Sequence, residues 1–167
     1  MERYVGIDGG GTKTRVSVGD AQGAELRSFT VGSTNHHSSS AGHVKNSVCD
    51  IFKALEGELP SIAGICFAGA GVDTARDEAF YTGLFREFGY QKRLLVCSDG
   101  LAALAGSNGG LRGAILIAGT GSITLAIAED GTLIRAGGWG YRTEGCCSGY
   151  ALAVEGIKAA GLEYDGI

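Results

Sequence analysis

One stretch sets the architecture of this chain: Val5-Gly6-Ile7-Asp8-Gly9-Gly10-Gly11-Thr12-Lys13-Thr14. Residues 4–8 have the pattern of a short buried strand, three glycines then predict a tight turn, and a second strand is expected to begin at Thr14. Because glycine has no Cβ, an anion can approach the backbone N–H groups of such a turn closely. The stretch therefore predicts a hairpin that binds phosphate.

The polar side chains around this turn suit the same task. Thr12 and Thr14 add hydroxyl donors, Lys13 adds a positive charge, and Asp8 is suited to hold Mg²⁺ through its waters. Walker-type and dinucleotide-binding loops are excluded, because in both the glycines open a helix. An ordinary glycine-rich hairpin remains the alternative for this stretch taken alone.

Composition limits the classes of function. The chain has 167 residues with 44% hydrophobic and 19% charged residues, which is typical of one globular domain or slightly more. A net charge of −4 argues against nucleic acid or an anionic membrane as partner. No apolar run is long enough to span a membrane, and the first residues do not resemble a signal peptide. Because the five cysteines also fit a reducing compartment, we expect a cytoplasmic protein.

The first 110 residues predict a mixed α/β layer. Val44, Val48, Ile51, Phe52 and Leu55 follow the spacing of one apolar helix face, which predicts an amphipathic helix. Three strands in hairpins followed by alternating helices and strands indicate a sheet flanked by helices. The expected strands cover residues 3–8, 13–19, 24–32, 62–68 and 94–97, and the expected helices 44–55, 79–88 and 100–105.

The pattern begins again after residue 110. Strands are expected at 113–118, 123–128 and 132–136, with the glycine-rich turn Gly119-Thr120-Gly121-Ser122 between the first two, and a helix at about 147–160. A hairpin with a glycine-rich turn thus opens each half. We predict two domains, 1–110 and 111–167, whose hairpins could bind a polyphosphate from both sides.

Five motifs carry a resemblance to a known family: GIDGGGTKT at 6–14, STNH at 33–36, SDGLAAL at 98–104, IAGTGS at 117–122 and GGWG at 137–140. Their order and spacing resemble the N-acetylglucosamine kinases, which belong with the BadF/BadG/BcrA/BcrD-type ATPases in the superfamily of actin, heat-shock chaperone ATPases and sugar kinases. The resemblance implies a duplicated ribonuclease H-like fold and ATP- and Mg²⁺-dependent phosphoryl transfer to the 6-hydroxyl of an N-acetylhexosamine.

The resemblance also implies roles for individual residues. Asp8 corresponds to the magnesium-linked acid, Asn35 to a sugar-contacting asparagine, Asp99 to the catalytic base that also contacts the sugar, and Ser122 to a residue close to the sugar. Taken alone, Asp99 more often represents a helix N-cap, and Asn35 a turn residue. The two phosphate motifs correspond to Gly9, Gly10, Gly11, Thr12 and Lys13, and to Gly119, Thr120 and Gly121.

Two departures from the family pattern leave alternatives open. The kinases usually continue after GGWG with Gly-Asp-Glu-Gly-Ser, whose aspartate has no counterpart in residues 141–150. The chain also ends before the family's adenosine motif, so we expect a first domain and the opening of a second. The alternatives are a non-catalytic sugar- or phosphate-binding fragment, and an activating ATPase of the acyl-CoA dehydratase or reductase type with an iron–sulfur cluster at Cys146-Cys147.

Two further expectations concern side chains outside the motifs and the association of the chain. His36 and His37 are interpreted as solvated loop residues, because adjacent histidines point apart on a strand and no partner stands at ligand spacing. An incomplete second sheet would leave an unpaired edge and an apolar face, so a homodimer through residues 111–167 is expected.

Overall fold

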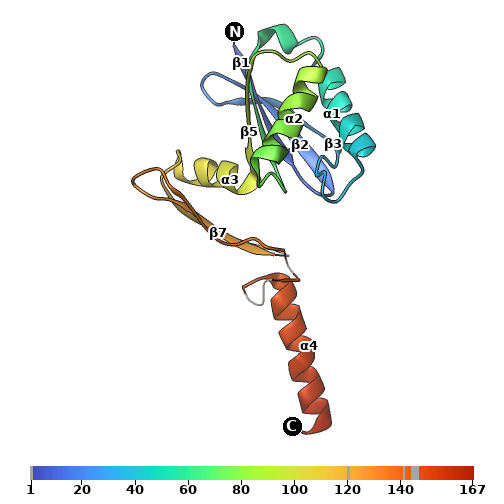
Figure 1. Ribbon diagram of the computed structural model, residues 1–167, viewed down its shortest axis with the longest axis vertical. Helices are drawn as coiled ribbons and strands as arrows, with labels where there is room; N and C mark the ends of the chain where they lie inside the picture. The colour runs from blue at the N-terminus through green and yellow to red at the C-terminus, as the bar shows by residue number, and fades with distance from the viewer. Residues whose placement is uncertain (1, 120, 141, 144–146) are drawn as a thin grey trace. The chain divides into compact units, whose positions relative to one another are not determined.

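The computed structural model describes residues 2–119, 121–140, 142–143 and 147–167 (Figure 1). The chain divides into two compact units, Met1–Ala102 and Ala103–Ile167. The division falls inside helix α3 (Asp99–Asn108), whereas the boundary expected from the sequence lies just after that helix. The boundary between residues 110 and 111 stays a prediction.

The first unit contains the mixed five-stranded sheet that the sequence predicts. Its strand order is β3-β2-β1-β4-β5, with β1–β2 and β2–β3 antiparallel and β1–β4 and β4–β5 parallel. This arrangement brings the carboxyl ends of β1, β3, β4 and β5 to one edge of the sheet. The strands are β1 (Arg3–Gly9), β2 (Lys13–Asp20), β3 (Glu25–Gly32), β4 (Ile62–Gly69) and β5 (Arg93–Ser98).

Two helices, α1 (Ala41–Leu55) and α2 (Ala75–Glu87), lie side by side over one face of this sheet (Figure 1). The predicted apolar stripe of α1 is buried, because that face packs on the sheet and on α2. Aromatic rings fill the layer: Phe67 of β4 lies 4.3 Å from Tyr81 and 5.6 Å from Phe85, measured between ring centroids. A short 3₁₀ helix, Leu59–Ser61, leads from α1 into β4.

Strand β1 shows which face of the sheet each residue uses. Val5 and Ile7 are buried beneath the helices, whereas Gly6 and Asp8 are exposed on the opposite face. Alternation along the strand therefore puts the Asp8 carboxylate on the side of the sheet away from α1 and α2.

The second unit is a three-stranded antiparallel sheet in the order β6-β7-β8, followed by one helix. Ser148 caps this helix by accepting a hydrogen bond from the Ala151 N–H. Among the described helices, none combines the length and the apolar character needed to cross a bilayer. The elements are β6 (Gly113–Ala118), β7 (Ser122–Ile127), β8 (Leu133–Gly137) and α4 (Gly149–Asp165).

Candidate functional site

The glycine turn between β1 and β2 is shaped by close contacts. A Cβ at Gly9 would lie 2.6 Å from Thr34 Oγ1 and 2.9 Å from Phe67 Cζ, and a Cβ at Gly10 would lie 2.7 Å from the Lys13 carbonyl oxygen. At Gly11 the nearest atom is Ser38 Oγ at 3.6 Å, which is ordinary contact. Packing therefore requires glycine at the first two positions and leaves space at the third.

A loop that follows β3, residues 33–39, is hydrogen-bonded to this turn. Ser33 Oγ donates to the Gly10 carbonyl oxygen at 3.0 Å, and the buried hydroxyls of Thr14 and Thr34 are 2.9 Å apart. The same loop carries Asn35, whose Oδ1 accepts the His37 N–H at 2.8 Å. The glycine turn and the Asn35 loop therefore form one connected structure.

Asp8, Thr12 and Lys13, which the sequence assigns to magnesium and phosphate, are all exposed beside the turn. Asp8 lines a cavity of about 230 Å³ on the open face of the sheet, together with Arg15 of β2 and Cys66 of β4. A carboxylate at this position can hold a hydrated divalent cation next to the turn.

Asp99 begins helix α3 directly after β5, at the same edge of the sheet. Ser98 Oγ accepts the Leu101 N–H at 3.2 Å, so Ser98 rather than Asp99 caps the helix. The Asp99 side chain is exposed, and its Oδ1 accepts the Gly100 N–H at 2.7 Å. Capping therefore does not account for an aspartate at this position.

The second glycine-rich turn lies in the other unit. The Gly119 N–H donates to the Gly121 carbonyl oxygen at 2.8 Å, and the Gly119 carbonyl accepts the Gly149 N–H at 2.8 Å. Ser122 is the first residue of β7 and is half-buried. Thr120 lies outside the described residues, as does Cys146.

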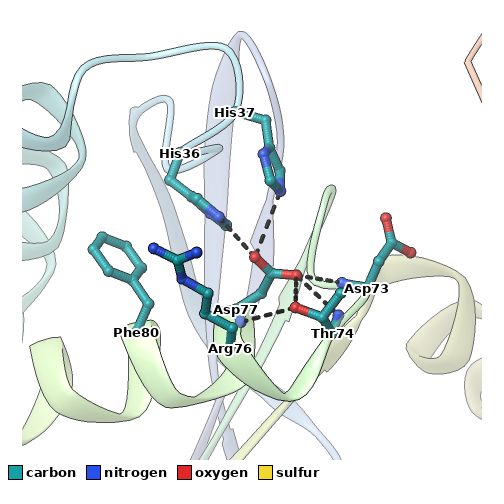
Figure 2. A pocket seen from close by; sticks show the side chains of 7 residues that line it. All are labelled: His36, His37, Asp73, Thr74, Arg76, Asp77 and Phe80. Atoms are coloured by element: carbon teal, nitrogen blue, oxygen red, sulfur yellow. Dashed lines mark hydrogen bonds and ion pairs between the residues drawn. The ribbon is translucent and has the colours of Figure 1, made fainter.

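Both His36 and His37 lie in the loop as expected, and His37 is exposed, but the expectation that neither has a partner is wrong, and His36 is only partly exposed. The loop turns at these residues, so their rings converge with centroids 4.0 Å apart instead of pointing apart as on a strand. His36 Nε2 lies 2.9 Å from Asp77 Oδ1, and its Nδ1 lies 2.9 Å from Tyr81 Oη (Figure 2). Sequence reasoning missed this cluster because Asp77 comes from α2, far along the chain.

Asp77 is held in its charged form by donors around it. The Thr74 hydroxyl, the backbone N–H groups of Asp73 and Thr74, and the His36 ring lower the pKa of Asp77 to about 2, although burial opposes the shift. Thr74 and Asp77 form a capping box at the start of α2. The carboxylate therefore both caps the helix and binds the loop that carries Asn35.

These loops share one edge of the first unit, because β1, β3, β4 and β5 all end there. A glycine turn with hydroxyl and ammonium donors suits phosphate, a side-chain amide suits sugar hydroxyls, and an exposed carboxylate suits proton transfer. Phosphoryl transfer to a polar acceptor requires groups of these three kinds.

Two curated proteins are similar to nearly the whole length of this chain. It is 32% identical to the N-acetylmuramic acid/N-acetylglucosamine kinase of Clostridium acetobutylicum over 99% of its own length and 55% of that protein. It is 30% identical to the N-acetyl-D-glucosamine kinase of Dictyostelium discoideum over 94% of its length and 53% of that protein. The chain thus spans about half the length of the curated relatives it matches.

Solved structures agree on the fold. A candidate N-acetylglucosamine kinase from Chromobacterium violaceum superposes with a TM-score of 0.75 at 27% identity, over 99% of this chain and 59% of that one. A ROK family glucokinase from Streptomyces griseus, in complex with glucose and AMPPNP, gives a TM-score of 0.59 at 23% identity over 80% of this chain and 46% of that one. The second likeness concerns the fold alone.

The family model of the BadF/BadG/BcrA/BcrD ATPases matches residues 5–167, which is nearly the entire chain. Together with the glycine turn and the mixed sheet behind it, this match means that the chain belongs to the BadF/BadG/BcrA/BcrD ATPase family.

Proposed function

We propose that this chain is part of an ATP-dependent sugar kinase that transfers a phosphoryl group to the 6-hydroxyl of N-acetylglucosamine or a related amino sugar. The observation that carries the proposal is the connection of the Asn35 loop to the glycine turn through Ser33 and Thr34. A kinase must hold its acceptor hydroxyl next to the phosphate that it receives. The names of the relatives give the substrate class.

Phosphoryl transfer asks the protein mainly for positioning and charge stabilisation. In the described part of the chain, the N–H groups of Gly11 and Thr12 donate to no protein acceptor, and the exposed Lys13 adds a positive charge beside them. These groups suit the oxygens of a polyphosphate. Asn35 Nδ2 suits a sugar hydroxyl, because Oδ1 is already engaged by His37.

We assign the proton transfer to Asp99. Its carboxylate takes the proton of the acceptor hydroxyl while that oxygen forms a bond to phosphorus and the bond to the leaving ADP oxygen breaks. The exposed side chain at the start of α3 is accessible to a sugar.

Mg²⁺ and the second glycine turn complete the proposal. Asp8 fits a hydrated Mg²⁺ because its carboxylate is exposed beside the turn, and the ion neutralises phosphate charge when bound. A phosphate role for Gly119, Thr120 and Gly121, and a sugar contact from Ser122, depend on the motif resemblance.

Two assays test the proposal together. ATP consumption is measured with N-acetylglucosamine and without sugar, and sugar binding is measured by calorimetry with the unchanged chain and with Asn35→Ala. Sugar-dependent ATP consumption supports the kinase. Sugar binding that Asn35→Ala weakens, without ATP consumption, supports a sugar-binding role alone. The proposal is refuted if the chain shows no sugar binding and no sugar-dependent ATP consumption with any amino sugar.

We also infer a cytoplasmic location and a homodimer. The described cysteines Cys49, Cys66, Cys97 and Cys147 are free thiols, which suits a reducing compartment, and ATP is available there. Cell fractionation tests the location, and the oligomeric state in solution tests the dimer.

A further inference from the structure

Two side chains of the Asn35 loop and one side chain of α2 together have the composition of a metal site. His36 and His37 come from the loop after β3, and Asp77 comes from the first turn of α2 (Figure 2). One potential ligand atom from each lies within 4.8 Å of the other two. His36 Nε2 is 2.9 Å and His37 Nε2 3.6 Å from the same oxygen, Asp77 Oδ1. Ligands on one zinc-sized ion lie about 3.0–3.4 Å apart, so small shifts suffice for coordination.

Tyr81 fixes the orientation of the His36 ring. The Tyr81 hydroxyl donates its single hydrogen to the Thr34 carbonyl oxygen, so its oxygen accepts from His36 Nδ1 at 2.9 Å. Nδ1 therefore carries a hydrogen, and Nε2 is the nitrogen that faces Asp77. Metal-binding histidines are typically held in this way, with the second ring nitrogen donating to a fixed partner.

The Asp77 carboxylate is also oriented in advance. Its Oδ2 accepts the Thr74 hydroxyl at 2.7 Å and the Thr74 N–H at 2.8 Å, which leaves Oδ1 toward the histidines. The side chain is only 9% exposed, and its pKa of about 2 keeps it ionised at neutral pH. Asp77, which is buried, and His36, which is half-buried, thus both have contacts that fix their orientation.

His37 is the exposed member of the cluster. Its side chain is 57% exposed, and its ring lies against Gly71, where a Cβ would come within 2.6 Å of His37 Cδ2. Gly71 therefore provides the space that the ring occupies. His37 Nε2 now donates to the Gly71 carbonyl at 3.0 Å and would exchange this bond for one to a metal.

We propose that His36, His37 and Asp77 bind one divalent transition-metal ion of the zinc type. Two imidazoles and a carboxylate are ligands that such ions favour. The cluster borders an open cavity of about 490 Å³, which leaves room for water or a further ligand. The ion would join the loop that carries Asn35 to helix α2, whatever reaction the protein catalyses.

Two charged groups beside the cluster shape the affinity. Asp73 and Arg76 line the same cavity as the cluster, and both are drawn in Figure 2. Because the guanidinium repels a cation, Arg76→Gln strengthens metal binding.

The full chain, treated with a chelator and dialysed, is titrated with Zn²⁺ by calorimetry and with Co²⁺ by visible absorption. We expect one equivalent to bind, His37→Ala to weaken binding by at least about tenfold, and Arg76→Gln to strengthen it. The matched control is His43→Ala, which removes the exposed histidine of α1 and should leave the affinity unchanged.

Three results overturn the proposal: no binding at micromolar metal, equal affinity in the unchanged chain and His37→Ala, or a thiolate-to-cobalt band that assigns the metal to cysteines. If circular dichroism shows that His37→Ala does not fold, NMR of the unchanged chain decides. Co²⁺ then broadens the ring signals of His36 and His37 more than those of His43 if the assignment is correct, and broadens all three alike if it is wrong.

Discussion

None of the three glycines of the first turn has a positive φ angle, so backbone conformation does not explain them. The space around each glycine differs. At Gly9 the missing Cβ makes room for Thr34 and Phe67, and at Gly10 for the backbone of Lys13. At Gly11 a Cβ would make only ordinary contact. Packing of the chain thus explains the first two glycines, and a ligand that approaches the backbone is a physical reason for the third.

This difference predicts that alanine at Gly9 and alanine at Gly11 affect different properties of the chain. Gly9→Ala should lower the free energy of unfolding by about 1–3 kcal/mol, because the new Cβ overlaps with Thr34 Oγ1 and the Phe67 ring. Gly11→Ala should leave the free energy of unfolding within about 0.5 kcal/mol and weaken nucleotide binding. Urea denaturation and a nucleotide titration measure the two effects. Equal losses of stability would contradict this account of the turn.

Substitutions at Asp99 and Ser98 distinguish a catalytic role of Asp99 from a role in capping α3. Asp99→Asn should lower the rate of sugar phosphorylation by about 10²–10⁴ with little change in stability, because it removes the proposed base and leaves the Ser98 cap intact. Ser98→Ala is the matched control and should cost about 0.5–2 kcal/mol of stability while the carboxylate remains. Full activity of Asp99→Asn, measured by ATP consumption, would show that Asp99 is not the base.

At the scale of elements, periodicity predicted most of the first unit. The spacing of Val44, Val48 and Ile51 predicted α1, and apolar runs between glycines predicted the strands. Periodicity is local, however, and could not show that Asp77 of α2 reaches His36 across the loop. A carboxylate three residues after Thr74 is the signature of a capping box, and that signal could have located the start of α2.

The stability that the first turn of α2 gives to the chain should decrease in acid. The pKa of Asp77 is about 2 in the folded chain against an ordinary value of 3.8, so the folded state favours the ionised carboxylate. The stability that this carboxylate contributes is present above about pH 4 and is lost as the pH falls toward 2. Asp77→Asn should therefore destabilise the chain at neutral pH and flatten the dependence of its stability on pH in that window.

Thermal unfolding from pH 2 to pH 7, with chelator present to exclude metal, measures this effect. Asp50→Asn is the matched control, because Asp50 is an exposed carboxylate of α1 with only an ion pair to Lys53 at 3.5 Å. If Asp77→Asn keeps the acid dependence of the unchanged chain, the low pKa of Asp77 is not what couples its stability to pH.

At the scale of the whole molecule, the two units differ in how well they bury apolar side chains. The first unit has a contiguous core between its sheet and helices. In the second unit both outer strands of the sheet, β6 and β8, are edges, and Leu125 is its only buried strand residue among those described. Large apolar side chains of this unit are exposed: Leu116, Ile117, Leu133, Ile134, Leu152, Ile157 and Leu162.

Exposed apolar side chains beside unpaired strand edges favour association with another chain. We therefore predict that this 167-residue chain self-associates through residues 111–167, most simply as a twofold dimer. Leu116 on the edge strand β6 is 66% exposed, and Leu116→Lys should weaken association by at least about tenfold by adding a charge to that edge. Leu26→Lys is the matched control, because Leu26 is 53% exposed on β3, the edge strand of the other sheet, and should leave association unchanged. Light scattering at micromolar concentration measures both variants, and a monomeric unchanged chain, or equal effects of the two lysines, would rule out this interface.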